Sequence, residues 1–197
     1  MATHNHPVQA GKVLLNLADT LKARLNEVEI IVVGSVEDDK PTGQGMPDFK
    51  FILSKETGGS KAFWLGIKEA QGEYIIWSCD DHEYHDPEWF EKYLAVRKEH
   101  PNINVFSFSS MFEYHGCVPI GSMKRDWYMN HYPEAVFGHY YWDVEIFDLA
   151  ANENSLVMAL GIRIRDKSRI HPTALSWQLD GEIYRRRKND IFKRSAL

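Results

Sequence analysis

Short apolar runs alternate with segments of helical periodicity through the first half of the chain. Val28–Val33 is rich in β-branched residues and almost continuously apolar, as expected for a strand buried on both faces. The same pattern predicts further strands at Phe49–Leu53, Glu73–Cys79 and Ile103–Ser109, and helices at Gln9–Leu25, Gly58–Ala70 and Asp86–Glu99. Strands that alternate with helices are joined by right-handed crossovers. The sequence therefore predicts an α/β fold, with a mostly parallel sheet and helices on both of its faces.

The second half of the chain has a less regular pattern. Met111–Tyr141 is irregular and aromatic, and a helix over Asp143–Leu160 and a short strand at Ile162–Arg165 are predicted after it. The 197 residues are 44% hydrophobic and contain no repeat or clear linker, which favours one globular domain over residues 1–197. We expect residues 1–110 to build the sheet and residues 111–197 to cover its edge.

Charge, cysteines and hydropathy exclude several classes of protein. The net charge of −5 disfavours a general nucleic-acid coat, and the basic run Arg185–Lys188 is typical of a solvated helix face. Cys79 and Cys117 are far apart and form no CxxC pattern, so a reduced, cytoplasmic setting is expected. No apolar run is long enough for a membrane helix, and the first ten residues contain no signal-peptide core.

Two adjacent acids, Asp80 and Asp81, follow directly after the predicted strand Glu73–Cys79. In open parallel sheets, ligands bind at the carboxyl ends of the strands. Adjacent carboxylates repel each other, so one of them usually needs a cation or a proton. An isolated acid pair would more simply be a polar strand end, but its place in this fold favours a metal site.

The stretch Gly58–Asp81 resembles the centre of GT-A fold glycosyltransferases, especially family 2. In that family a Gly-initiated helix ends in A-x-G-E-Y-I, here Ala70–Ile75, and a strand then leads to an acidic DxD-type motif. The similarity extends from Thr3 to His171. It includes a first nucleotide loop (Thr3–Pro7), a proline-started helix (Asp86-Pro87) and an xED motif (Tyr141–Asp143).

Three positions depart from the family pattern. Only Met1-Ala2 precede the first loop, where an apolar strand is usual, so either that strand is very short or the native start lies upstream. The usual V-V-D is Val32-Val33-Gly34, so the acid that contacts uracil is missing, and Glu37, Asp38 or Asp39 could replace it. The usual A-R-N is Ala62-Phe63-Trp64, which leaves Lys61 as the nearest cation for a diphosphate.

The resemblance implies a metal-dependent, inverting glycosyltransferase that uses a nucleotide-diphosphate sugar, with a UDP-sugar as the expected donor. It implies metal ligation by Asp81 and His171, with Mn²⁺ or Mg²⁺ as the cofactor. It also implies donor binding within residues 1–110 and acceptor binding within residues 111–197. The expected donor-binding residues are Thr3, Asn5, Glu37, Lys61, Asp80 and Gly138.

A carboxylate across the site is the natural general base for an inverting transfer, and Asp143 is the candidate. It lies near a predicted helix start, whose dipole would keep it ionised, and Glu145 lies close enough to be confused with it. Two alternatives stay open: a non-catalytic sugar- or nucleotide-binding module on a degenerate glycosyltransferase fold, and a nucleotidyltransferase acting on sugar phosphates. The acceptor (glycan, protein, lipid-linked or small molecule) and a homo-oligomeric state also stay open.

Overall fold

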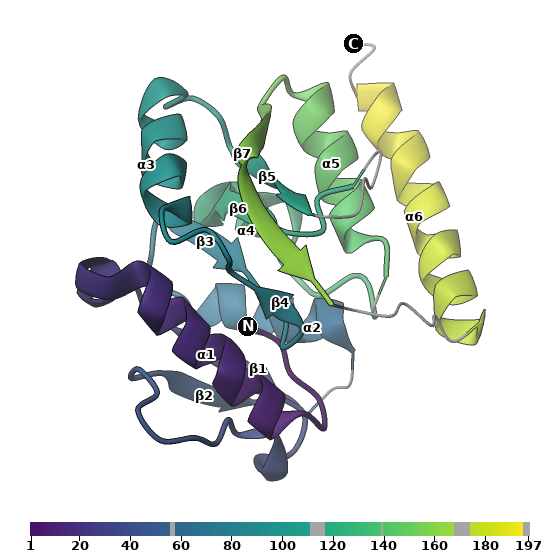
Figure 1. The fold of residues 1–197 in the computed structure, drawn as a ribbon. Helices are drawn as coiled ribbons and strands as arrows, with labels where there is room; N and C mark the ends of the chain where they lie inside the picture. The colour runs from purple at the N-terminus through teal and green to yellow at the C-terminus, as the bar shows by residue number, and fades with distance from the viewer. Residues whose placement is uncertain (56–57, 111–116, 139, 168–173, 195–197) are drawn as a thin grey trace.

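The computed structural model describes residues 1–55, 58–110, 117–138, 140–167 and 174–194, and Figure 1 shows their arrangement. The helices in chain order are α1 (Pro7–Leu21), η1 (Lys22–Glu27), η2 (Glu37–Asp39), α2 (Gly59–Glu69), α3 (Trp89–Glu99), α4 (Arg125–His131), α5 (Trp142–Asn152) and α6 (Ala174–Arg194). The strands are β1 (Ile31–Gly34), β2 (Lys50–Leu53), β3 (Tyr74–Trp77), β4 (His82–Glu83), β5 (Val105–Ser110), β6 (Gly121–Lys124) and β7 (Leu156–Asp166).

Two groups of hydrogen-bonded strands form the central sheet. β1 pairs with β2 in parallel, and a five-stranded group has the order β3-β6-β5-β7-β4. Ala2 joins the groups, because it forms parallel bridges to Val33 of β1 and to Cys79 just after β3. β1, β2, β3, β5 and β7 therefore run in one direction, whereas β4 and β6 are antiparallel to their neighbours. The predicted α/β fold with a mostly parallel sheet is confirmed.

Each face of the sheet has its own apolar core. On one face, Leu14 of α1 and Trp89 of α3 belong to a cluster with Phe106 of β5. On the other face, Phe63 of α2 belongs to a cluster with Val105 of β5 and with buried residues of α4 and α5. Successive side chains of a strand point to opposite faces, which is how one short strand serves both cores.

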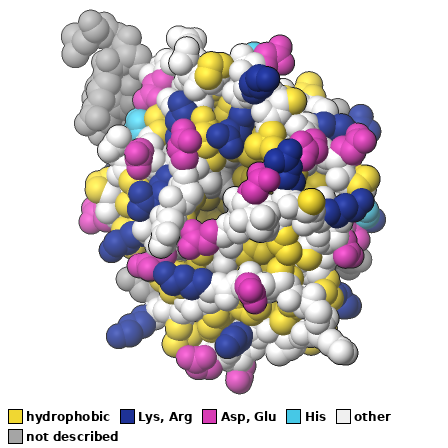
Figure 2. Space-filling model, turned by 90° about the vertical axis from the view of Figure 1, so that its left-hand side faces the viewer, with side chains coloured by type: hydrophobic (Ala, Val, Ile, Leu, Met, Phe, Trp, Pro, Cys, Tyr) yellow, Lys and Arg dark blue, Asp and Glu magenta, His cyan; other side chains and the backbone are white. Residues whose placement is uncertain are grey.

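Residues 1–3 occupy the strand position between β1 and β3. The N–H of Val33 donates to the carbonyl of Met1 at 2.9 Å, and the N–H of Ala2 donates to the carbonyl of Ser78 at 3.1 Å. These residues thus lie between β1 and β3, and Ala2 forms a parallel bridge to each side. A cavity of about 330 Å³ continues their path between β1 and β3 and is lined in part by Tyr74–Trp77. Figure 2 shows the side of the molecule where α3 and the start of β3 lie, and hydrophobic side chains reach the surface there among charged ones.

The second half differs most from the sequence-based prediction. The helix predicted over Asp143–Leu160 ends at Asn152, and an eleven-residue strand, β7, replaces its last turns. Asn154 has a left-handed backbone (φ 52°), and the N–H of Ser155 donates to the carbonyl of Ala150 at 2.8 Å. Such a left-handed residue ends a helix, because its backbone cannot continue the helical turn. β6 and α4 also form inside the segment that was predicted to be irregular. Because β6 and β7 lie within the sheet, the expectation that residues 111–197 only cover its edge is wrong.

Among the residues that the structure describes, no helix combines the length and the apolar character that a membrane crossing needs. The cytoplasmic location expected from the cysteines stays a prediction.

Candidate active site

A cavity of about 410 Å³ lies where residues 1–3, β1, β2 and β3 end and α2 begins. The chain segments that follow these strands supply its wall, as expected for a ligand site at the carboxyl edge of a parallel sheet. The lining residues are Ala2, Thr3, His4, His6, Gly34, Ser35, Ser54, Gly58, Gly59, Ala62, Phe63, Cys79, Asp80 and Asp81. The structure therefore brings three of the predicted site residues together here: Thr3, Asp80 and Asp81.

Thr3 holds the first acid of the pair. Its hydroxyl donates a hydrogen bond to Oδ2 of Asp80 at 2.9 Å, and its own N–H is bonded to the carbonyl of Val33 at 3.0 Å. Thr3 is buried, so this contact fixes the Asp80 carboxylate relative to the sheet. Asp80 is thereby held in the wall of the cavity.

Asp81 lies in an electrostatically unfavourable place. Burial, together with the nearby carboxylates of Asp166 and Asp80, raises its pKa from 3.8 to about 6. Its Oδ1 atom is buried and has no hydrogen-bond partner among the described residues. Such an oxygen costs free energy unless a proton or a cation binds to it. A hard divalent cation bound by the Asp81 carboxylate would satisfy this oxygen.

Asp166 was not predicted from the sequence. It is the last residue of β7, it is buried, and it lies opposite His82 in the β4–β7 pairing. The main chain reinforces this closeness, because the N–H of Lys167 donates to the carbonyl of Asp81 at 3.0 Å. The sequence showed an acid at the end of an alternating strand, but nothing in it indicated that this strand would lie beside the acid pair.

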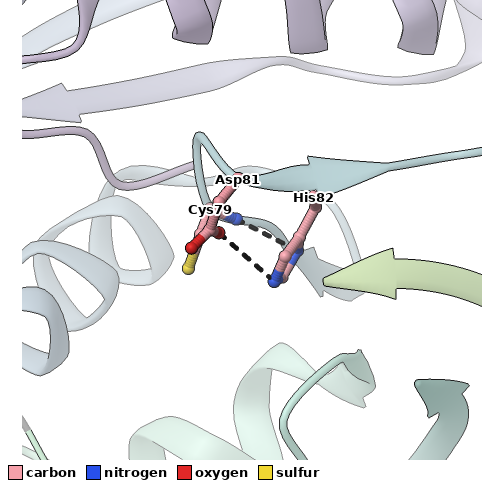
Figure 3. A group of neighbouring side chains, drawn as sticks. All are labelled: Cys79, Asp81 and His82. Atoms are coloured by element: carbon pink, nitrogen blue, oxygen red, sulfur yellow. Dashed lines mark hydrogen bonds and ion pairs between the residues drawn. The ribbon is translucent and has the colours of Figure 1, made fainter. Parts of the chain in front are cut away.

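Cys79 and His82 complete a cluster with Asp81, shown in Figure 3. The N–H of Cys79 donates to Nδ1 of His82 at 3.1 Å, and Nε2 of His82 lies 3.9 Å from Oδ1 of Asp81. Burial lowers the pKa of His82 to about 4, so the ring is neutral and, with Nδ1 accepting, carries its proton on Nε2. Burial and the neighbouring acids raise the pKa of the Cys79 thiol well above its usual value. In this arrangement Asp81 supplies the carboxylate ligand of the cluster, and metal binding through Cys79 or His82 would require each of them to lose its proton.

The acid expected to replace the family's missing aspartate is not at the cavity. Glu37 is exposed on η2 and does not line the cavity; the buried acid of this loop is Asp39. Burial acts to raise the pKa of Asp39, but hydrogen bonds from the N–H groups of Asn5, Ser35 and Val36 outweigh it, and the pKa is lowered. Asp39 thus ties the two loops beside the cavity to each other. The sequence offered Asp39 as one of three choices, and only its burial distinguishes it.

Gly34 itself leaves no room for a side chain. A Cβ atom there would lie 2.6 Å from Cβ of Asp39 and 2.9 Å from the Phe51 ring. An aspartate at this position would therefore require the loop to move. The packing of Asp39 and Phe51 around residue 34 therefore requires glycine where the family pattern has aspartate.

Asn5 and Lys61 lie beside the cavity wall rather than in it. Asn5 has a left-handed backbone (φ 59°), and its N–H donates to Asp39. Lys61 is half-buried in the first turn of α2. Neither residue lines the cavity. His171, the second expected metal ligand, lies outside the described residues.

Gly138 and Asp143 belong to the second half of the chain. A side chain at Gly58, which lines the cavity, would collide with the carbonyl oxygen of Gly138, so the two backbones are in close contact. Asp143 is the second residue of α5 and is half-buried. Burial raises its pKa, although hydrogen bonds from the N–H of Val144 and from the Cys117 thiol act against that rise. Burial therefore acts against the helix dipole at this position, and the expectation that the helix start keeps Asp143 ionised stays a prediction.

Comparison with known proteins identifies what this arrangement is similar to. The model of the family described as "Glycosyl transferase family 2" matches residues 1–115, which is more than half of the chain. No curated protein matches the chain by sequence.

Solved structures share the fold at low sequence identity. A mannosyltransferase from Pyrobaculum calidifontis, in complex with GDP-Man and Mn²⁺, aligns with a TM-score of 0.64 and 11% identity over 91% of this chain and 59% of its own. TarS from S. aureus, residues 1–349 in complex with UDP-GlcNAc, aligns with a TM-score of 0.63 and 14% identity over 87% of this chain and 58% of its own. Glucosyl-3-phosphoglycerate synthase from Mycobacterium tuberculosis aligns with a TM-score of 0.58 and 8% identity over 100% of this chain and 79% of its own. That structure contains Mn²⁺, UDP and glucosyl-3-phosphoglycerate. The chain thus spans less than two thirds of the length of the first two proteins.

Proposed function

The chain belongs to glycosyl transferase family 2, and we propose that it transfers a sugar, with inversion, from a nucleotide-diphosphate sugar to an acceptor in a metal-dependent reaction. The observation that carries the proposal is the Asp81 carboxylate. It follows β3 beside the 410 Å³ cavity, has a buried oxygen with no hydrogen-bond partner among the described residues, and is repelled by Asp80 and Asp166. A cation held there would satisfy the oxygen and offset the repulsion.

A divalent metal at this place would offset the charge that grows on the leaving diphosphate. Asp81 would hold it, with Asp166 close by, and we keep His171 as a further ligand. The oxygen-rich donor set suits Mg²⁺ or Mn²⁺, and a histidine nitrogen would favour Mn²⁺. Asp80, fixed by Thr3 through Oδ2, would orient the donor through its other oxygen.

Asp143 is the proposed general base. Its raised pKa makes the carboxylate a stronger base than an exposed aspartate, which suits proton removal from an acceptor hydroxyl. The Cys117 thiol donates to the carboxylate and limits its rotation. A base that activates the acceptor directly, without a covalent sugar intermediate, gives inversion at the sugar carbon.

We favour a UDP-sugar as donor, since two of the three structures compared above contain uridine nucleotides and one contains GDP-Man. The side chain that usually contacts uracil cannot be present at Gly34, and the Asp39 carboxylate is occupied by backbone N–H groups. The polar side chains of His4, His6, Ser35 and Ser54 also line the cavity. A guanine nucleotide therefore belongs in any donor screen.

The test is a panel of UDP-, GDP- and dTDP-sugars with the purified protein, with and without Mn²⁺, measuring the release of nucleoside diphosphate. We expect Mn²⁺-dependent release from one donor, reduced at least about 100-fold by Asp81→Asn and by Asp143→Asn, because each removes a group that acts in the transition state. Asp126→Asn is the matched control, since this aspartate is 91% exposed on α4.

Three other outcomes would overturn the proposal. Nucleotide binding without release, in the presence of a range of sugar acceptors, would support a non-catalytic binding module. Release that persists in Asp81→Asn would mean that the metal is held elsewhere. Formation of a nucleotide sugar from a sugar phosphate and a nucleoside triphosphate would instead identify a nucleotidyltransferase.

A further inference from the structure

A buried carboxylate on α6 binds the main chain of the loop that leads into α5. Oδ1 of Asp180 accepts a hydrogen bond from the N–H of Gly138 at 2.9 Å, and Oδ2 accepts one from the N–H of Tyr140 at 2.8 Å. The Asp180 side chain is only 4% exposed. Hydrogen bonds from N–H groups to a buried carboxylate are among the stronger ones in proteins, so this contact constrains the loop.

The same loop borders the donor cavity on its other side. The carbonyl of Gly138 is packed so closely against Gly58 that no side chain could fit at residue 58, where φ is 119°. Gly58 and Gly59 line the cavity and begin α2. The loop is therefore held between Asp180 and the wall of the donor site.

The loop also sets the start of α5. Tyr141 is its last residue and the N-cap of α5, with a left-handed backbone (φ 67°) that is uncommon for a residue other than glycine. Its ring packs against Trp177 at 4.7 Å and Tyr184 at 5.3 Å, both on α6. Asp143 follows two residues later. The direction of the first turn of α5 thus depends on contacts made by α6.

Asp180 is not what docks α6 onto the domain. Figure 1 shows α6 alongside α5, and polar side-chain contacts join the two helices independently of Asp180. Arg187 is bonded to Glu145 at 2.8 Å, and the hydroxyl of Tyr184 donates to Asp148. The Asp180 carboxylate instead directs both of its oxygens at backbone N–H groups of the loop.

We propose that Asp180 is a positioning residue, which holds Gly138 and Tyr140 at the wall of the donor cavity and so orients the first turn of α5 and Asp143 for the transfer. The inference rests on the proposed function for its catalytic part, but not for the ordering of the loop. Asp180 itself touches neither substrate nor metal in this scheme. It acts through the loop.

The test compares Asp180→Asn with Glu182→Gln, an equal loss of charge at an exposed position two residues along α6. The first readout is amide hydrogen exchange over residues 137–141. The side-chain amide that replaces the carboxylate in Asp180→Asn would place an N–H donor opposite one of the loop N–H groups. We therefore expect at least about tenfold faster exchange in this segment, with exchange in β5 and α2 unchanged and no change in Glu182→Gln.

The second readout separates binding from turnover. With the donor found in the panel, kcat of Asp180→Asn should fall at least about tenfold while KM and nucleotide affinity stay within about twofold, because Thr3 and the acid pair are untouched. A merely structural role would move neither kcat nor loop exchange once the fraction of folded protein is corrected for. Asp180→Glu, which keeps the charge, should recover part of the exchange protection.

The outcomes separate the two proposals. Unchanged loop exchange in Asp180→Asn would overturn the positioning role, whatever the activity. Faster exchange with unchanged kcat would show that the loop position is not used in the transfer. If the wild-type protein releases nucleotide from no donor, the proposed function is wrong, and so is the catalytic part of this inference. Hydrogen exchange alone then decides whether Asp180 holds the loop.

Discussion

Two regions of the molecule contain partly or fully buried carboxylates, and they differ in what faces the negative charge. At the end of β3, Asp80, Asp81 and Asp166 lie close together, and the pKa of Asp81 is raised by burial and by the other two acids. Between α5 and α6, burial also raises the pKa of Glu145, but this carboxylate faces Arg187, which acts against the rise. In the second region the protein supplies the compensating cation itself. In the first region the charge is left for a ligand to compensate.

The difference is visible in the contacts of each carboxylate. Both oxygens of Glu145 are bonded to Arg187, at 2.8 and 3.1 Å, and the Tyr132 hydroxyl donates to one of them at 2.9 Å. Asp148 in the same interface binds Lys188 at 3.0 Å. These contacts join helices and have a structural role. An acid with a buried oxygen that lacks a hydrogen-bond partner among the described residues, such as Asp81, instead suggests a binding role.

The largest expected effect comes from removing the cation of the α5–α6 pair. Arg187→Met should lower the free energy of unfolding by about 3 kcal/mol, because it leaves the Glu145 carboxylate buried without its partner. Urea denaturation at pH 7 measures the change. Arg186→Met is the control, since Arg186 is 81% exposed and lies 3.8 Å from Glu182. The control should change stability by less than about 0.5 kcal/mol.

A double variant sharpens this prediction. Glu145→Gln combined with Arg187→Met removes the unpaired charge, so it should recover part of the lost stability. If the double variant is as unstable as the sum of both single changes, the pair is not coupled and the comparison between the two regions loses its basis.

The next effect concerns the acid cluster at β3. Mn²⁺ at roughly a hundred times its Kd should stabilise the folded protein by about 2.7 kcal/mol, which is about 5–10 °C in Tm for a domain of this size. Thermal unfolding with Mn²⁺ and with EDTA tests this. Asp126→Asn should keep the shift and Asp81→Asn should lose most of it. An equal shift in both variants would place the metal away from Asp81.

The sheet-building part of the fold could be predicted because its signals are local. The apolar runs of β1, β2, β3 and β5 and the glycine start of α2 are visible in the sequence, and the boundaries shift by only a few residues. The end of α5 was missed. It depends on the left-handed backbone of Asn154, which lies in the polar run Asn152–Ser155 between α5 and β7.

The residues of the candidate site also differ in whether a local sequence signal predicts them. Asp80 and Asp81 were predictable because a motif and a strand end coincide within one short stretch. Asp166 and Asp180 were not, because each reaches its place through the pairing or packing of an element distant in sequence: β7 beside β4, and α6 beside α5. No spacing rule connects residues that meet only in the folded structure.

The smallest effect is the most direct test of the uncompensated charge. Without metal, Asp81→Asn should be more stable than the wild-type protein at pH 7.5, by about 2 kcal/mol. A pKa raised from 3.8 to about 6 corresponds to a free energy somewhat larger than this, and the solvent screening that comes with the 31% exposure of the side chain reduces that free energy.

The pH dependence tests the same charge. The folded state binds the extra proton between about pH 4 and pH 6, so wild-type stability falls as the pH rises through this window. The advantage of Asp81→Asn, measured by urea denaturation in EDTA, should therefore be full above pH 7 and vanish near pH 4, with Asp126→Asn flat throughout. A variant that is less stable than wild type at pH 7.5 would mean that the Asp81 carboxylate is already compensated within the fold, and the two regions would then not differ in kind.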